Sequence, residues 1–203
     1  HQIKTPLSVM RLQLQSEDTP ENRAMLAELF QMEQYVTMAL SYARLGNPTK
    51  DLVLTRVPLD PVIRQAIRDF APPLIRKKLR LQYEPTTESA LTDSKWLLFI
   101  LHQLLSNAVK YTERGRVSIR VTSAPAIIVA DTGIGIAPED VPRVFEKGYT
   151  GYNGRGGQKS TGLGLYLVHQ TAKMLHCRVS LSSRIGEGTS VTIDLHQEEL
   201  GKE

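Results

Sequence analysis

Apolar side chains recur at helical spacing in the first 45 residues of the chain. The opening run consists of Ile3, Leu7, Met10 and Leu14. This 4-3-4 spacing predicts one narrow helical seam. The polar residues 16–20 predict a turn whose proline begins a second helix. The seam resumes in residues 21–45 and stops at the Gly-Asn-Pro of residues 46–48, so the pattern predicts an antiparallel helical hairpin.

Two helices alone cannot bury both of their apolar seams. The economical solution is a four-helix bundle made by two copies of the chain, so we predict a homodimer. The alternative is a hairpin that packs on a globular domain of its own chain.

From residue 52 onward, strand-like and helical patterns are mixed. The strand-like runs are residues 52–57, 79–84, 116–122, 126–130, 178–183 and 189–195. The helical patterns are residues 59–77, 95–111 (with Asp93 as its cap) and 165–175, with a short helix near 138–145. Strict βαβ alternation is missing, which favours an α+β two-layer sandwich over a doubly wound sheet. The expected organisation is a hairpin over residues 1–46, a linker at 47–51, an α+β domain over 52–197 and a tail at 198–203.

Composition narrows the class of protein. The chain has 203 residues, enough for one globular domain plus a small appendage. Its net charge of +4 is too mild to indicate a nucleic-acid partner, so we expect none. Cys177, the single cysteine, excludes an internal disulfide and a cysteine-based zinc site. The longest apolar run, residues 96–101, is far shorter than the ~18 residues of a membrane helix. We therefore expect a soluble, cytoplasmic piece cut from a longer protein.

The first segment with candidate chemistry lies in the predicted helix 95–111. Gln103, Asn107, Lys110 and Tyr111 fall close to one helical face by their three- and four-residue spacing. This face places amide oxygens, which can bind Mg²⁺, beside an ammonium group and a phenol. The alternative is an ordinary polar helix face.

The second segment is Asp131-Thr-Gly133-Ile-Gly135, directly after an apolar strand. A carboxylate at the end of a buried strand can accept a hydrogen bond from an amino group such as that of adenine. The glycines allow a backbone to approach a ligand without a Cβ clash. The alternative is a β-turn that happens to contain an aspartate.

The third segment is a glycine-rich run that ends in Thr161-Gly162-Leu163-Gly164 at the head of an apolar helix. Free N–H groups and the helix dipole at such a point favour a phosphate. The run contains neither a P-loop nor a G-x-G-x-x-G fingerprint. Each segment alone is a weak signal, but the three in this order and in these contexts are a strong one.

In this order the segments resemble the boxes of the Bergerat-type (GHKL) ATP-binding fold, which sensor histidine kinases share with gyrase-type, chaperone-type and mismatch-repair ATPases. The similar segments are the N box at residues 103–112, the G1 box at 131–136, the F box at 144–145 and the G2 box at 160–165. The opening His1-Gln-Ile-Lys-Thr-Pro-Leu resembles the H box of histidine kinases. Together with residues 148–155, it is similar to the intramembrane-sensing kinases that respond to bacitracin and antimicrobial peptides alongside ABC transporters.

The resemblance implies an ATP-dependent protein-histidine kinase with Mg²⁺, in which His1 attacks the γ-phosphate. It implies a homodimer that passes the phosphoryl group to an aspartate of a response regulator, and often dephosphorylates that regulator. It also implies the cytoplasmic portion of a cell-membrane protein, with an ABC transporter as a partner through a membrane region. The alternatives are an ATPase or serine kinase of another branch, and a catalytically degenerate dimeric scaffold.

The resemblance also assigns roles to residues of the ATP site. Asn107 and Gln103 would hold the metal, and Gln103 stands where the family usually has asparagine. The nucleotide-binding residues would be Lys110, Tyr111, Asp131, Gly133, Gly135, Thr161, Gly162, Leu163, Gly164 and Thr189, with Arg155 and Lys159 in the lid loop. The alternative for the last two is that they are solvated loop charges.

Two residues beside His1 carry further expectations. Gln2 stands where the family usually has an acidic residue, and an amide can orient an imidazole but cannot act as a general base. Thr5 follows His1 by four residues, hence on the same helical face, where the family places a water for dephosphorylation of the regulator.

Overall fold

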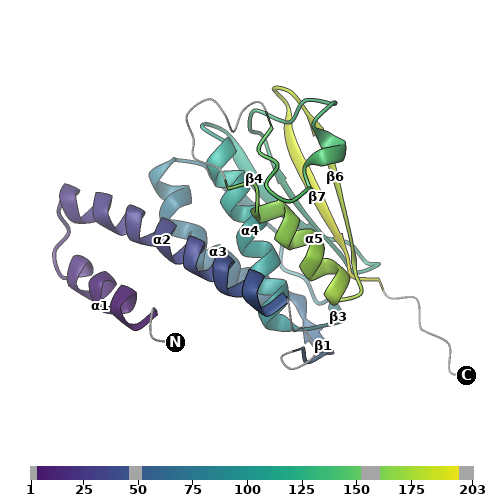
Figure 1. The fold of residues 1–203 in the computed structure, drawn as a ribbon, viewed down its shortest axis with the longest axis horizontal. Coiled ribbons are helices and arrows are strands. Elements are labelled where there is room, and N and C mark those ends of the chain that lie inside the picture. The colour runs from purple at the N-terminus through teal and green to yellow at the C-terminus, as the bar shows by residue number, and fades with distance from the viewer. Residues whose placement is uncertain (1–3, 46–51, 152–160, 197–203) are drawn as a thin grey trace, which may run out of the picture. The chain divides into compact units, whose positions relative to one another are not determined.

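The computed structural model describes residues 4–45, 52–151 and 161–196. The chain divides into two compact units, His1–Asn47 and Pro48–Glu203, which we describe separately (Figure 1). No helix of the described ranges is long and apolar enough to cross a membrane.

The first unit, the helical unit, consists of α1 (Lys4–Gln15) and α2 (Pro20–Leu45). The hydroxyl group of Thr19 accepts a hydrogen bond of 3.1 Å from the N–H of Asn22, so it caps α2, which begins at Pro20 as predicted. The helix ends at Leu45, directly before the predicted stop. Leu7 lies buried between these elements, but Met10 of the same predicted seam is 50% exposed.

The second unit, the α+β unit, contains a five-stranded sheet in the order β2-β4-β5-β7-β6. Its strands are β2 (Arg80–Tyr83), β4 (Arg116–Val121), β5 (Ala126–Asp131), β6 (Arg178–Arg184) and β7 (Gly188–Asp194). β2 pairs with β4 in parallel, and all other pairs are antiparallel. This mixed sheet confirms the expected α+β sandwich.

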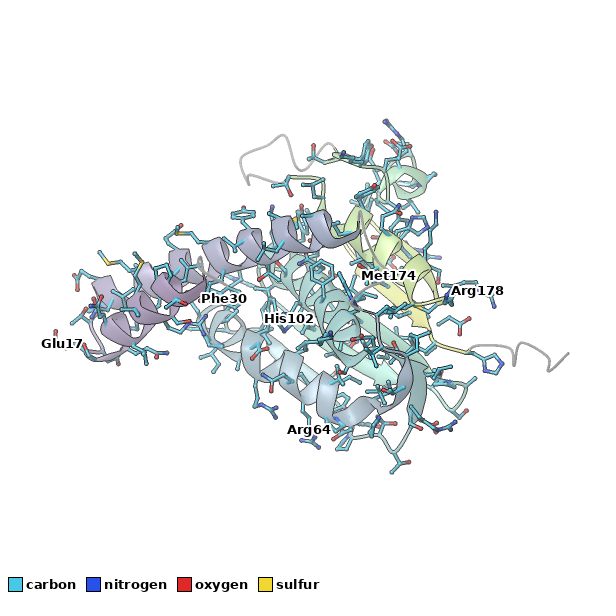
Figure 2. All side chains as sticks on the ribbon, turned by 60° about the horizontal axis from the view of Figure 1, so that its bottom comes forward. Glu17, Phe30, Arg64, His102, Met174 and Arg178 are labelled. Atoms are coloured by element: carbon cyan, nitrogen blue, oxygen red, sulfur yellow. The ribbon has the colours of Figure 1, made fainter. Side chains whose placement is uncertain are left out.

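Three helices lie on one face of this sheet (Figure 1). They are α3 (Leu59–Arg76), α4 (Ser94–Tyr111) and α5 (Gly164–Met174). Figure 2 labels His102, which lies on α4 and faces α3, where its Nε2 is 2.9 Å from Oδ2 of Asp69. The core fills the space between helices and sheet, with fully buried Ile100 and Leu101 from α4 and Ile127 and Ile193 from the strands.

A second, two-stranded sheet was only half predicted. β1 (Thr55–Pro58) pairs antiparallel with β3 (Ser89–Thr92), with Val57 opposite Ala90. The predicted strand at 52–57 is therefore shifted, and β3 was missed. Four residues with two polar members carry no clear period, so only the pairing with β1 defines this strand. The helix expected near 138–145 is reduced to a single 3₁₀ turn, η2 (Val141–Arg143).

Asp93 fixes the start of α4, the helix that carries the first candidate segment. Its Oδ1 accepts a 2.9 Å hydrogen bond from the N–H of Lys95, as the predicted cap requires. Its Oδ2 accepts a second, also of 2.9 Å, from the N–H of Val53. The buried carboxylate thus caps the helix and also holds the chain that leads into β1.

Candidate functional site

Two amide side chains of α4 point at the first residue of α5. A Cβ built on Gly164 would stand 3.3 Å from Oε1 of Gln103 and 3.9 Å from Oδ1 of Asn107. Gln103 is 4% exposed. Neither amide makes a side-chain hydrogen bond to any residue that the structure describes. Two unpaired amide oxygens thus converge beside Gly164.

The end of α4 places a cation and an aromatic ring one turn further along. The Nζ atom of Lys110 lies 5.3 Å from the centroid of the Tyr111 ring, within the range of a cation–π contact. Both side chains are half-buried. The carbonyl oxygen of Tyr111 accepts a 3.1 Å hydrogen bond from the N–H of Ile134, which ties this helix end to the loop after β5.

Asp131, the last residue of β5, holds a carboxylate at the edge of the core. Its Oδ1 accepts a 2.8 Å hydrogen bond from the N–H of Gly133. Burial raises the pKa of Asp131, while the N–H groups of Gly133 and Thr189 and the hydroxyl group of Thr112 act to lower it. The site therefore keeps a desolvated hydrogen-bond acceptor.

Gly133 stands where no side chain fits. A Cβ there would lie 2.4 Å from the carbonyl oxygen of Tyr111 and 2.8 Å from Oδ1 of Asp131. Real Cβ atoms do not come this close to oxygen. The close approach of the loop to the end of α4 therefore requires glycine at this position.

Thr189 supports the same loop from the neighbouring strand. It lies opposite Asp131 in the β5–β7 pairing. Its hydroxyl group is 2.9 Å from Oγ of Ser183, which also accepts a 2.8 Å hydrogen bond from the N–H of Ile136. Gly135 has a φ of +71°, and a Cβ built on it would stand 1.9 Å from the carbonyl oxygen of Arg184.

A backbone hydrogen bond between Gly148 and Gly162 fixes the segment directly before α5. The N–H of Gly148 donates a 3.0 Å hydrogen bond to the carbonyl oxygen of Gly162. Gly162 has a φ of +65°, and a Cβ there would stand 2.3 Å from the carbonyl carbon of Gly148. Thr161 accepts a 3.4 Å hydrogen bond from the N–H of Leu163, the residue directly before α5. The N-terminus of α5 therefore lies beside the side-chain amides of Gln103 and Asn107.

The structure brings most of the predicted site residues into one part of the α+β unit. They are Gln103, Asn107, Lys110, Tyr111, Asp131, Gly133, Gly135, Thr161, Gly162, Leu163, Gly164 and Thr189. Thr5 lies in the helical unit, on α1, where it is exposed. His1, Gln2, Arg155 and Lys159 lie outside the described residues. Their roles stay predictions.

Sequence reasoning did not single out two residues that shape this site. Thr112 follows the candidate helix face directly, and its fully buried hydroxyl group lies beside Asp131. Ser183 joins Thr189 to the loop at Ile136, 47 residues away. The position of Thr112 next to Tyr111 was a usable signal, whereas nothing local marks Ser183.

The arrangement has three chemical capacities. Asp131 can accept a hydrogen bond from an amino group, and the α5 N-terminus with Lys110 provides positive potential for phosphates. Among the described residues, no group of three or more His, Cys, Asp or Glu side chains could hold a metal ion. Mg²⁺ is commonly bound by few protein oxygens together with substrate phosphates. The unpaired amides of Gln103 and Asn107 fit that requirement.

Comparisons with known proteins agree with these capacities. Residues 92–199, more than half of the chain, match the family described as histidine kinase-, DNA gyrase B-, and HSP90-like ATPase. The sensor protein BceS of Halalkalibacterium halodurans is 36% identical over 202 residues, which are 98% of this chain and 60% of BceS. The sensor histidine kinase YxdK of Bacillus subtilis is 36% identical over 197 residues, 94% of this chain and 61% of YxdK.

A solved structure extends the similarity to the fold. The crystal structure of full-length ShkA in complex with AMPPNP has a TM-score of 0.65 and 26% identity, and covers 95% of this chain and 43% of ShkA. The chain spans about 60% of the length of the curated relatives it matches. It belongs to the family of histidine kinase-, DNA gyrase B- and HSP90-like ATPases, and its predicted resemblance to sensor histidine kinases is confirmed.

Proposed function

We propose that this member of the ATPase family is the kinase portion of a sensor histidine kinase, which phosphorylates itself on His1 and passes the group to an aspartate of a response regulator. The observation that carries the proposal is the similarity to sensor kinases over 98% of the chain, helical unit included. The other branches of the fold lack the H box that residues 1–7 resemble.

The side chains of the α+β unit would bind and orient ATP. Asp131 would accept a hydrogen bond from the adenine amino group, with Thr189 behind it. Lys110 and the backbone at Gly162 and Gly164 would hold the phosphates. Asn107 and Gln103 would hold Mg²⁺, which neutralises phosphate charge when bound. Arg155 and Lys159 would contact phosphate from the lid loop. Phosphoryl transfer depends on such positioning more than on covalent chemistry from the protein.

His1 would be the nucleophile, because a neutral imidazole is competent near pH 7. General-base assistance is typically worth 10²–10⁴-fold, and Gln2 cannot provide it. We therefore expect slow autophosphorylation and a faster Gln2→Glu variant with unchanged nucleotide affinity. Equal rates would contradict this role of Gln2.

The partners of the chain follow from the same proposal. The helical unit, residues 1–46, would form the four-helix bundle of a homodimer, and residues 52–197 the catalytic domain. We propose attachment to the cell membrane, signalling of envelope stress caused by antibiotics, and an ABC transporter as a partner through a membrane region.

Thr5→Ala should reduce dephosphorylation of the regulator and spare autophosphorylation.

Incubation with Mg²⁺ and γ-labelled ATP tests the proposal. We expect protein-bound label that survives alkali, is lost in acid and is absent from the His1→Ala variant. The matched control is His196→Ala, an exposed histidine after β7, which should label like the wild type. Steady ATP hydrolysis without label would favour another branch of the family, and nucleotide binding without either would favour a scaffold.

A further inference from the structure

The C-terminal end of α4 leaves several backbone carbonyl groups without a partner inside the helix, as every helix does. The N–H of Thr112 donates 3.1 Å to the carbonyl oxygen of Ala108, and the N–H of Ile134 donates 3.1 Å to that of Tyr111. The carbonyl groups of Val109, Lys110 and Thr112 need another donor.

One side chain, Lys77, supplies that donor for all three. Its Nζ atom lies 2.7 Å from the carbonyl oxygen of Val109, 3.2 Å from that of Lys110 and 3.2 Å from that of Thr112. An ammonium group has three N–H donors, so these contacts use all of them. A cation at a helix C-terminus also interacts favourably with the helix dipole.

The backbone around Lys77 is held in place by the end of α3. The N–H of Lys77 donates 3.1 Å to the carbonyl oxygen of Pro73, and that of Leu79 donates 3.0 Å to Leu74. Lys78 has a φ of +54°, which turns the chain sharply toward β2. Burial lowers the pKa of Lys77, while the nearby carboxylate of Glu113 acts to raise it.

We propose that Lys77 is a positioning residue of the nucleotide site, acting through the last turn of α4. That turn carries Lys110 and Tyr111. The carbonyl oxygen of Tyr111 accepts the hydrogen bond from the N–H of Ile134, in the loop that follows Asp131. Lys77 fixes the carbonyl groups of Lys110 and Thr112, on both sides of Tyr111. It thereby sets the position of Lys110, the proposed phosphate contact, relative to Asp131, the proposed adenine contact. The inference rests on the proposed function, and Lys77 touches no reacting group.

A purely structural cap would differ from a positioning residue in one measurable respect. Loss of a structural cap lowers the stability of the fold and leaves the affinity of the folded protein unchanged. Loss of a positioning residue weakens nucleotide binding in protein that is still fully folded, because small displacements at a site cost affinity and rate steeply.

The test is the Kd of Mg-ATP for the Lys77→Met variant, measured by titration calorimetry at a temperature where circular dichroism shows full folding. Methionine keeps the length of the side chain and removes all three donors. We expect an increase in Kd of about 10-fold, together with shifts of the ¹⁵N–¹H signals of Tyr111, Thr112 and Ile134 in the nucleotide-free protein, while signals of β6 stay in place. Lys78→Met is the matched control, since Lys78 is the exposed neighbour and should bind as the wild type does.

The outcomes separate the inference from the function on which it rests. Equal Kd values for wild type and Lys77→Met would overturn the positioning role and leave the proposed function intact. A wild-type protein that does not bind Mg-ATP would overturn both. If Lys77→Met does not fold, Lys77→Gln replaces it, because its shorter, neutral side chain stays polar but cannot donate to all three carbonyl groups. A Kd for Lys77→Gln equal to that of Lys78→Met would then count against the inference.

Discussion

The helical unit and the α+β unit contain similar apolar side chains but bury them to different extents. In the α+β unit, Ile100 and Leu101 of α4 are completely buried. In the helical unit, the buried apolar residues of the described chain are Leu7, Leu29 and Met38. Its large exposed apolar residues in the described chain are Val9, Met10, Leu12, Met25, Met32 and Tyr35, with Leu12 at 69% and Met25 at 56%. The α+β unit has the core of a self-sufficient domain, whereas the hairpin leaves large apolar side chains exposed, as the proposed homodimer would require.

Separation of the units is the strongest way to test this difference. We expect residues 48–203 alone to unfold cooperatively in urea, because their core lies within the unit. We expect residues 1–47 alone to lose most of their helical circular dichroism at low micromolar concentration, because isolated hairpins of two helices are marginal in water. Full helicity that does not depend on concentration would show that the hairpin needs no partner.

Truncation within each core compares the units residue by residue. Ile100→Ala removes a fully buried side chain and should lower the free energy of unfolding of the α+β unit by about 2–5 kcal/mol. Leu29→Ala, its counterpart at 4% exposure in the helical unit, should leave that transition unchanged. Urea unfolding followed by fluorescence of Trp96 in α4 measures the transition. A large effect of Leu29→Ala on this signal would show that the two units unfold together.

A charge on the exposed seam tests what the hairpin surface is for. Met32 is 52% exposed on α2, seven residues after Met25 and three before Tyr35, the spacing of a helix–helix seam. We expect Met32→Glu to weaken the proposed homodimer at least 10-fold in analytical ultracentrifugation, because the buried charge would lack a partner. Gln15→Glu adds the same charge at an exposed position by the turn and should leave the dimer intact. A dimer unaffected by both would place the interface elsewhere.

Local signals predicted much of the fold and of the site. The Asp93 cap, the proline start of α2 and the stop after Leu45 rest on neighbouring residues and were predicted correctly. The residues on α4 share a face because helical spacing alone puts them there. The contact of Lys77 with Val109 and that of Ser183 with Ile136 could not be predicted in this way, since the residues they join lie more than 30 positions apart. β3 was missed for the same reason, because its definition depends on β1.

The smallest expected effect concerns the stability that the α+β unit loses by burying the carboxylate of Asp131 at the candidate site. Burial raises the pKa of Asp131 above its ordinary value near 3.8. The folded state therefore binds a proton more tightly than the unfolded state, and stability falls as the pH rises from about 3.8 through the raised pKa. An asparagine side chain carries no charge at any pH. The Asp131→Asn substitution should therefore raise the Tm of the nucleotide-free protein at pH 7 and change it little near pH 4.

If Asp131 accepts from the adenine amino group as proposed, the same substitution should weaken nucleotide binding, because the single amide oxygen already accepts from the N–H of Gly133 and the NH2 group would face another donor. Glu139→Gln, at an exposed position, is the matched control and should change neither Tm nor affinity. A lower Tm for Asp131→Asn at pH 7 would mean that the hydrogen bonds from Gly133 and Thr189 outweigh the desolvation of the carboxylate. A higher Tm would show that the α+β unit gives up stability at Asp131 for recognition, while the helical unit leaves apolar surface exposed for assembly.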